Sequence, residues 1–349
     1  MENILSKKIK QNILNFGPIS IAEFMQNILF DQESGYYIKE NPFGSEGDFI
    51  TAPEISQVFG EILAAYIIYY WQNIGKPQEF TIIELGPGRA ELMSDVLRTL
   101  KTKVELYKIL EVNLIELSPK LRKIQQEKLS VFDVKITHYE DISNLANKPS
   151  FILANEFFDA LPITQYQYQD YNWHERKIAL DKQRNFTFIL EKNHHKINLE
   201  LGSLEAKNND IYEICYPALN MMEDIAKFLK LSKSAAIFID YGYIEKQFGD
   251  SLQALKKHKY YDVFKSLGTA DLTAHVDFSA LAKIVNNNNL PCNLSTQREF
   301  FTMLGFRERS RALANNSNQH KQKKLQIAED RILAKEQMGE LFKVMLINA

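Results

Sequence analysis

One stretch of this sequence constrains the fold more than any other: the apolar, β-branched run FTIIEL at 80–85 leads directly into the glycine turn GPGRA at 86–90. The run predicts a buried strand, and the residues at about 91–101 predict the helix that follows it. Three more apolar runs are expected to be strands, at 109–117, 131–137 and 151–154. Strands that alternate with helices favour βαβ units and a parallel sheet, so an α/β fold is expected.

The pattern changes on both sides of this core, which divides the chain into three parts. Residues 1–77 show helical spacing of apolar residues and predict an N-terminal helical segment that ends in one long helix at 54–73. Residues 78–163 and 231–349 are expected to form the α/β core. Residues 164–230 alternate apolar and polar side chains before a helical stretch, which predicts a β-hairpin and helix insertion.

The overall composition excludes several classes of protein. The chain has 349 residues with 42 Lys and Arg against 44 Asp and Glu, and this balance excludes an overall basic protein that coats nucleic acid. Two cysteines are too few for a disulfide framework or a Cys-rich zinc site, and no metal is expected. No apolar run approaches the ~18 residues of a membrane span. Residues 314–324 are polar and basic without apolar periodicity, which predicts a surface loop or a locally mobile segment.

The residues around the glycine turn decide between three kinds of ligand. A P-loop needs G-x-x-x-x-G-K-[ST], which does not occur in the chain. A dinucleotide site needs a third glycine where this chain has Glu91, and an acid there repels the pyrophosphate of NAD. S-adenosylmethionine carries a sulfonium and an ammonium, so acids favour it. Glu84 is placed to hold the ammonium, and Gly86 and Gly88 let a ligand approach the backbone.

A G-x-G turn also occurs without a ligand. The assignment of a cofactor site therefore depends on the residues at the ends of the neighbouring strands. Glu116 ends the next predicted strand, where an acid takes ribose hydroxyls in nucleotide-binding sheets. Asp141 follows the third predicted strand and is expected to face the adenine edge. Together with Glu84, these acids favour a cofactor site over a plain turn.

Acids also follow the fourth predicted strand. Asn155 and Glu156 end it, and Asp159 lies one helical turn further on. Asn155 is expected to belong to the cofactor site. A carboxylate accepts the donor fork of an arginine guanidinium, a cation with a pKa above about 12, and orients its nitrogen toward a methyl group. Glu156 is therefore the candidate for holding a cationic substrate, with Asp159 assisting. The alternative is helix capping by Asn155 or Asp159.

Two more polar clusters are open to a functional and a structural interpretation. Asp48, Thr51 and Glu54 stand at the start of a predicted helix. Asp48 and Thr51 are expected in the cofactor site, and the alternative is that the cluster caps the helix. His275 lies two residues before Asp277, and a neighbouring acid would tune this histidine as a proton acceptor in catalysis. The alternative for His275 is a structural role.

These strings together resemble one known family, the MidA-like class I methyltransferases, which include the mitochondrial complex I assembly factor that methylates arginine. The matching strings are FGPISIAEFM at 16–25, SGYY at 34–37, GDFITAPEISQVFGE at 47–61, ELGPGR at 84–89, IELSPKLRKIQ at 115–125, ANEFFDALPI at 154–163, WHER at 173–176, IDYGY at 239–243 and ADLTAHVDFSAL at 270–281.

The resemblance implies a Rossmann-like class I methyltransferase sheet that uses S-adenosylmethionine as cofactor. It implies symmetric dimethylation of an arginine in the 49-kDa-type subunit of NADH:ubiquinone oxidoreductase (complex I) during assembly. By position, Glu84, Gly86 and Gly88 match the family's cofactor loop, and Glu116 matches its ribose acid. The other matched positions are Asn155, Glu156 and Asp159 of the NE-x-x-D motif, and Asp48, Thr51 and Glu54 of the N-terminal motif.

The chain departs from the family at three positions. Ala90 stands where a second glycine is frequent, Leu267 where proline is usual, and Glu299 where glycine is expected. Alanine is small, so the turn at Ala90 is expected to survive.

Two alternatives to protein arginine methylation stay open. One is an assembly chaperone that binds S-adenosylmethionine without essential catalysis, and the other is a methyltransferase that acts on another amine. The expected partner is a protein substrate, with no nucleic acid and no membrane span, and a homodimer stays open. The expected location is the cytoplasm of a bacterium, or the mitochondrial matrix for a processed eukaryotic chain.

Overall fold

A computed structural model describes residues 3–31, 33–39, 51–191, 201–202, 204–256, 259–265, 267–315 and 317–348. The chain forms two compact units, each assembled from segments that are distant in the sequence. The first unit comprises Met1–Phe49, Phe158–Met221 and Glu245–Ala280, and the second comprises Ile50–Phe157, Met222–Ile244 and Leu281–Ala349.

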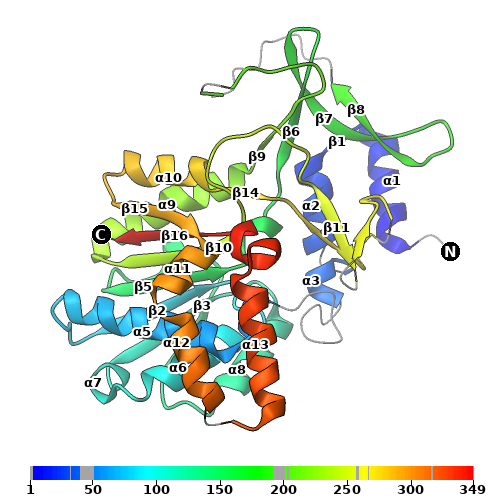
Figure 1. Cartoon of the computed structure of the whole chain (residues 1–349). Coiled ribbons are helices and arrows are strands. Elements are labelled where there is room, and N and C mark those ends of the chain that lie inside the picture. The colour runs from blue at the N-terminus through cyan, green and yellow to red at the C-terminus, as the bar shows by residue number, and fades with distance from the viewer. Residues whose placement is uncertain are drawn as a thin grey trace. The chain divides into compact units, whose positions relative to one another are not determined.

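The second unit is built on a largely parallel sheet in the order β15-β16-β10-β5-β2-β3-β4 (Figure 1). Its strands are β2 (Phe80–Leu85), β3 (Leu110–Ile115), β4 (Lys135–Tyr139), β5 (Ser150–Asn155), β10 (Ala235–Tyr243), β15 (Cys292–Thr296) and β16 (Phe342–Asn348). The strands β10, β5, β2, β3 and β4 pair in parallel, whereas β16 is antiparallel to both of its neighbours. Every residue of β2 is buried, as expected for a central strand covered on both faces.

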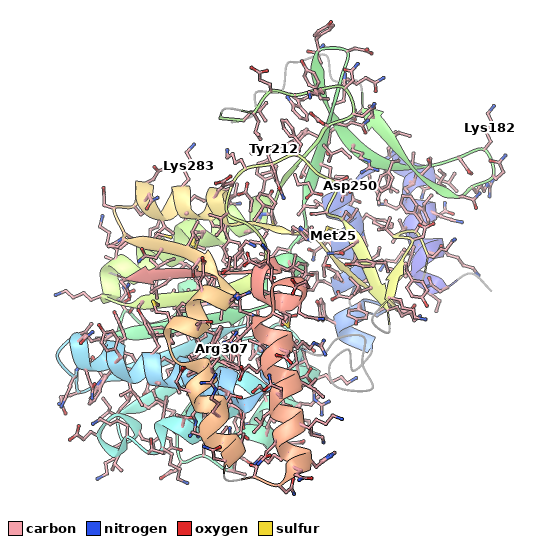
Figure 2. All side chains as sticks on the ribbon, in the orientation of Figure 1. Met25, Lys182, Tyr212, Asp250, Lys283 and Arg307 are labelled. Atoms are coloured by element: carbon pink, nitrogen blue, oxygen red, sulfur yellow. The ribbon has the colours of Figure 1, made fainter. Side chains whose placement is uncertain are left out.

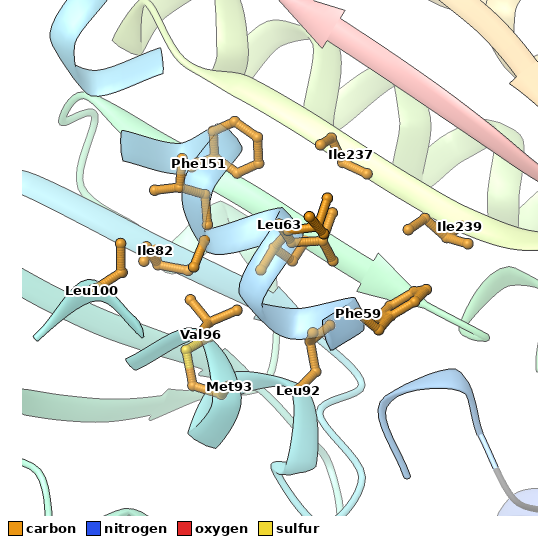
Figure 3. Packing of buried hydrophobic residues seen from close by; sticks show 14 of the residues in the cluster. Phe59, Leu63, Ile82, Leu92, Met93, Val96, Leu100, Phe151, Ile237 and Ile239 are labelled. Carbon is orange, nitrogen blue, oxygen red and sulfur yellow. The ribbon is translucent and has the colours of Figure 1, made fainter. Parts of the chain in front are cut away.

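Helices cover both faces of this sheet (Figure 1). They are α4 (Ala52–Ile55), α5 (Gln57–Asn73), α6 (Glu91–Leu100), α7 (Val104–Tyr107), α8 (Pro119–Leu129), α9 (Tyr216–Ser232), α10 (Phe278–Asn287), α11 (Gln297–Met303), α12 (Phe306–Asn315) and α13 (Gln319–Leu333), with the short turns η1 (Ile142–Asn144) and η3 (Lys335–Gly339). Phe59 and Leu63 of α5 pack between α6 and the sheet residues Ile82, Phe151 and Ile237 (Figure 3). This buried layer holds β2 in place, and the glycine turn follows the carboxyl end of that strand.

Two expectations for helices in this unit were wrong. The helix expected at 54–73 is divided into α4 and α5, because Ser56 adopts an extended backbone and its hydroxyl accepts the Val58 N–H to start α5. The loop expected at 314–324 is occupied by the end of α12 and the start of α13. The buried side chains of α13 begin only at Leu325, so the polar first half of this helix shows no apolar periodicity.

The first unit combines helices with antiparallel sheets. Its elements are α1 (Ile4–Phe16), β1 (Ile19–Ser20), α2 (Ile21–Phe30), α3 (Tyr36–Lys39), η2 (Phe158–Ala160), β6 (Thr164–Gln169), β7 (Asn172–Leu180), β8 (Phe186–Glu191), β9 (Ile211–Ile214), β11 (Gln253–Lys256), β12 (Lys259–Tyr261), β13 (Asp271–Thr273) and β14 (Val276–Asp277). One sheet has the order β1-β7-β6-β9 with β8 beside β7, and another has the order β12-β11-β13.

The helices of the first unit bury one apolar stripe each. Leu5, Ile9 and Ile13 of α1 recur every four residues and join Phe24 and Met25 of α2 in one buried cluster. The sulfur of Met25, which is labelled in Figure 2, accepts the backbone N–H of Ile163 at 3.5 Å. Among the helices that the structure describes, none is long and apolar enough to cross a membrane.

Candidate active site

The glycine turn lies between β2 and α6 and is built from left-handed backbone. Gly86 and Gly88 have φ of 58° and 51°, and Ala90 also adopts a left-handed φ of 59°. The Gly86 N–H donates to the Ile115 carbonyl at the end of β3 at 3.0 Å. A Cβ on Gly86 would lie only 2.6 Å from Cδ2 of the Phe157 ring. Glycine is therefore required at 86 both for backbone conformation and for close packing.

We expect Gly86→Ala to destabilise the protein more than Gly202→Ala, although both glycines are left-handed. Gly202 has nothing within 4 Å of its virtual Cβ, so its substitution adds only backbone strain of about 1 kcal/mol. At Gly86 the overlap with Phe157 adds about 1–3 kcal/mol and displaces the turn. Urea unfolding and cofactor titration of both variants measure this, and equal losses of stability would contradict the packing role of Gly86.

Glu84 is the penultimate residue of β2 and its side chain is buried. Only 3% of its surface is exposed, and Oε2 has no hydrogen-bond partner among the described residues. Burial raises the pKa of the Glu84 carboxyl to about 8, because an ionised carboxylate loses its hydration there. A buried, unsatisfied carboxyl two residues before the glycine turn suits a cationic ligand group such as the ammonium of S-adenosylmethionine.

Glu116 follows β3, as expected for a ribose acid, and two donors hold its carboxylate. The Ser118 N–H donates to Oε1 at 2.8 Å, and the Gln125 amide donates to Oε2 at 3.1 Å. Burial nevertheless raises the pKa of Glu116, with these hydrogen bonds acting in the opposite direction. The residues that bind and orient this carboxylate leave it fixed beside the turn.

Gln125 was not identified from the sequence, yet it connects three parts of the site. The fully buried amide of Gln125 donates to the Gly88 carbonyl at 2.8 Å as well as to Glu116. Its oxygen lies 2.9 Å from Nε2 of His138, so that nitrogen carries a proton. Leu121, Gln125 and Leu129 are the buried positions of α8, and a glutamine in this row of leucines was the available signal.

Removing the Gln125 amide is expected to loosen the turn. In Gln125→Leu the Gly88 carbonyl and the Glu116 carboxylate each lose a buried donor, which destabilises the fold by about 1–3 kcal/mol. The affinity for S-adenosylmethionine should fall several-fold, measured by calorimetry. The control is Gln126→Leu on the exposed face of the same helix. A Gln125 variant with wild-type affinity would show that the connection does not shape the cofactor site.

The turn after β5 carries Asn155 and Glu156. Glu156 has a left-handed φ of 52°, a conformation that costs energy for a non-glycine residue and often marks a functional position. Its N–H donates to the Ile239 carbonyl of β10 at 2.9 Å. Its Oε1 accepts from the Asn155 amide at 3.0 Å and from the Ala52 N–H at 3.4 Å. The carboxylate is thus held in place from two sides.

Asp240 on β10 was not identified from the sequence as a residue of this turn. Its side chain is fully buried, and Oδ2 accepts the Phe157 N–H at 3.0 Å while Oδ1 accepts the Tyr241 N–H at 2.9 Å. Phe157 in turn packs on Gly86. Asp240 therefore links the turn that bears Glu156 with the glycine turn.

Other predicted positions make helix-capping contacts. The Thr51 N–H donates to Glu54 Oε2 at 3.1 Å at the start of α4. Asp141 begins η1 by accepting the Ser143 N–H at 2.7 Å, and this bond lowers the pKa of Asp141. Their roles toward a cofactor remain predictions. Asp48 lies outside the described residues.

Asp159 and His275 belong to the first unit. Asp159 is 6% exposed, and its carbonyl accepts the Ala274 N–H at 3.0 Å. The His275 N–H donates to the Ser251 hydroxyl at 2.9 Å. Asp277 accepts from Ser279 and the Ala280 N–H, so it caps α10. The predicted catalytic roles of Asp159 and His275 remain predictions.

The chain matches a family described as S-adenosyl-L-methionine-dependent methyltransferase over residues 62–295. A relative from Danio rerio named "Protein arginine methyltransferase NDUFAF7, mitochondrial" is 33% identical, with 97% of this chain and 85% of the relative covered. The Homo sapiens protein of that name is 32% identical, with 96% and 81% covered. The resemblance to MidA-like methyltransferases is thereby confirmed.

Two solved structures from Burkholderia thailandensis share the fold. One is a COG1565 superfamily member bound to S-adenosyl-homocysteine, with a TM-score of 0.85, 23% identity, and 99% of this chain and 92% of that chain covered. The other, a native structure from the same superfamily, has a TM-score of 0.83, 24% identity, and 99% and 91% covered. The predicted α/β methyltransferase fold is confirmed.

The observed features of the second unit fit such a cofactor: a left-handed glycine turn, the buried Glu84 carboxyl beside it, and Glu116 at the adjacent strand end. From this site and the family match over residues 62–295, the chain belongs to the S-adenosyl-L-methionine-dependent methyltransferases and is an enzyme that uses this cofactor.

Proposed function

We propose that this enzyme methylates arginine in a protein substrate. The observation that carries the proposal is the Glu156 carboxylate, which is fixed on a left-handed turn by Asn155 and Ala52. The next residue, Phe157, packs on the glycine turn of the cofactor site. The relatives named as protein arginine methyltransferases, matched over almost the whole chain, support the same substrate class.

The residues of the site perform the parts of this reaction that need positioning and charge. Glu84 would hold the cofactor ammonium and Glu116 the ribose hydroxyls. The glycine turn would let the cofactor approach the protein backbone closely. When bound, S-adenosylmethionine supplies an electrophilic methyl group. Glu156 would bind the guanidinium fork through charge-assisted hydrogen bonds and orient one nitrogen in line with the methyl–sulfur bond. That bond breaks as the nitrogen–carbon bond forms, and the methylated nitrogen loses one proton. The carboxylate also stabilises the positive charge of the guanidinium in a site of low dielectric.

The finer proposal concerns product and partner. We propose symmetric dimethylation of an arginine in the 49-kDa-type subunit of NADH:ubiquinone oxidoreductase, during assembly of that complex. The names of the relatives support arginine as the acceptor, and the sequence motifs carry the resemblance that implies the subunit and the symmetric product.

The test combines the purified protein, labelled S-adenosylmethionine and the recombinant 49-kDa-type subunit. Mass spectrometry of digested peptides should find dimethylarginine, and fragmentation should show the loss of monomethylamine that marks the symmetric isomer. A subunit preparation with its arginines changed to lysine is the control. Label found only on a small amine, or cofactor binding with no transfer to either preparation, would overturn protein arginine methylation in favour of the two alternatives.

A further inference from the structure

The first unit contains a buried cluster of carboxyl and hydroxyl side chains to which the reaction described above gives no role. The Tyr37 hydroxyl donates toward both oxygens of Asp271, at 3.3 and 3.4 Å. Asp271 is 4% exposed and also accepts the N–H of Leu272 at 2.9 Å. Tyr37 comes from α3 and Asp271 from β13, so two distant segments of the sequence meet here.

A second carboxylate lies within electrostatic reach of the same hydroxyl. Asp159, in η2, is 6% exposed, and the Ala274 N–H bonds its carbonyl at 3.0 Å directly after β13. Burial, Asp271 and Asp159 all raise the pKa of Tyr37 well above its usual value. The phenol therefore stays protonated, and two carboxylates gather around it.

Thr273 provides an independent indication of a ligand. Its side chain is fully buried, and Oγ1 has no hydrogen-bond partner among the described residues. Thr273 and Asp271 are two residues apart on β13, so their side chains point to the same face of the strand. A buried hydroxyl that the described part of the protein leaves unsatisfied is expected to be satisfied by something that binds.

We propose that Asp271, Asp159, Tyr37 and Thr273 form a pocket for a guanidinium of the protein substrate, an inference that rests on the proposed function. Oxygen acceptors from three segments match the several N–H donors of a guanidinium. A divalent cation fits less well, because it takes six or more oxygens and prefers charged or carbonyl ligands over a neutral phenol. Since Glu156 of the second unit is assigned to the acceptor arginine, the guanidinium bound here belongs to a second arginine of the same substrate.

Thr273→Val is the most selective test, because it removes an oxygen for which the structure gives no hydrogen bond and keeps the shape of the side chain. We expect an equal or higher melting temperature, an unchanged Kd for S-adenosylmethionine, and a three- to tenfold higher KM for a substrate peptide with two arginines. Asp271→Asn should raise KM at least tenfold, and Tyr37→Phe by less. Asp262→Asn, at an exposed acid of the same unit, is the matched control.

Binding of peptides in the presence of S-adenosyl-homocysteine gives a readout that does not require turnover. The wild type should bind an arginine peptide at least tenfold more tightly than its neutral citrulline counterpart, and Thr273→Val should reduce that preference. Unchanged preference and unchanged KM in Thr273→Val and Asp271→Asn would overturn the pocket.

Two further experiments identify which arginine of the substrate is bound and distinguish failure of the pocket from failure of the proposed function. Thr273→Val should raise KM for a peptide with two arginines and leave KM unchanged for a peptide whose single arginine is the acceptor. The opposite pattern would overturn the assignment of the pocket to a second arginine. Absence of methylation by the wild type, together with retained arginine preference in binding, would refute the proposed function and leave the pocket supported.

Discussion

Replacing Glu156 with glutamine is expected to lower kcat/KM for arginine methylation by roughly 10²–10³-fold, the loss typical of removing one preorganised charge from an active site. Glutamine keeps the size of the side chain and an oxygen that accepts from Asn155 and Ala52. What it loses is the negative charge that binds and orients the guanidinium. The affinity for S-adenosylmethionine should change by no more than a few-fold.

The measurement is a steady-state methyl-transfer assay with a calorimetric titration of the cofactor on the same preparation. Glu105→Gln, at an exposed glutamate of the same unit, is the control. Turnover close to wild type in Glu156→Gln would refute the proposed role of Glu156. A dead variant that still supports complex I assembly would favour the chaperone alternative.

Glu84→Gln is expected to weaken cofactor binding and at the same time to stabilise the cofactor-free protein. Loss of a charge-assisted hydrogen bond to the ammonium should raise the Kd by roughly 10- to 100-fold. The stability gain arises because folding moves the pKa of this carboxyl from 4.5 to about 8. At neutral pH the folded chain must bind a proton that the unfolded chain does not, which costs about 3 kcal/mol.

The sign of the pH dependence follows from this raised pKa. The contribution of Glu84 to stability is fully present below pH 4.5 and is lost as the pH rises toward about 8. Urea unfolding measured from pH 5 to 8 should therefore show that the free energy of unfolding falls less in Glu84→Gln than in the wild type. Glu79→Gln, at an exposed glutamate just before β2, should not change the decline.

Cofactor binding should also release protons. If the ammonium ionises Glu84, binding near pH 7 releases close to one proton, and affinity increases with pH up to about 8. Calorimetry in two buffers of different ionisation enthalpy measures this release. No proton release in the wild type would mean that Glu84 stays neutral in the complex, and the ammonium would then need another partner.

The strands could be predicted well where apolar runs are long and buried on both faces. The runs at 80–85, 109–117 and 151–154 correspond to β2, β3 and β5. The run at 131–137 does not coincide with β4, which spans Lys135–Tyr139. Among the described strands this edge strand pairs with β3 alone, and none of its residues is buried, so its position depends on register more than on hydrophobicity.

The glycine turn, Glu84, Glu116 and Glu156 could be located from the sequence because each lies at or just after the carboxyl end of a strand, where parallel strands end together. Gln125 and Asp240 could not be assigned in this way. Gln125 donates a hydrogen bond to Gly88, 37 positions away, and Asp240 accepts one from Phe157, 83 positions away. Such contacts depend on helix packing and strand pairing, which no local pattern specifies.

The sequence by itself determined the α/β class, the position of the cofactor turn and the family, because periodicity, turn chemistry and motif order are local properties of the chain. Only the tertiary structure decided that residues 1–49, 158–221 and 245–280 gather in one unit. It also decided that Tyr37, Asp159 and Asp271 meet there. These side chains are far apart in the sequence, and burial brings them together only when the whole unit has folded.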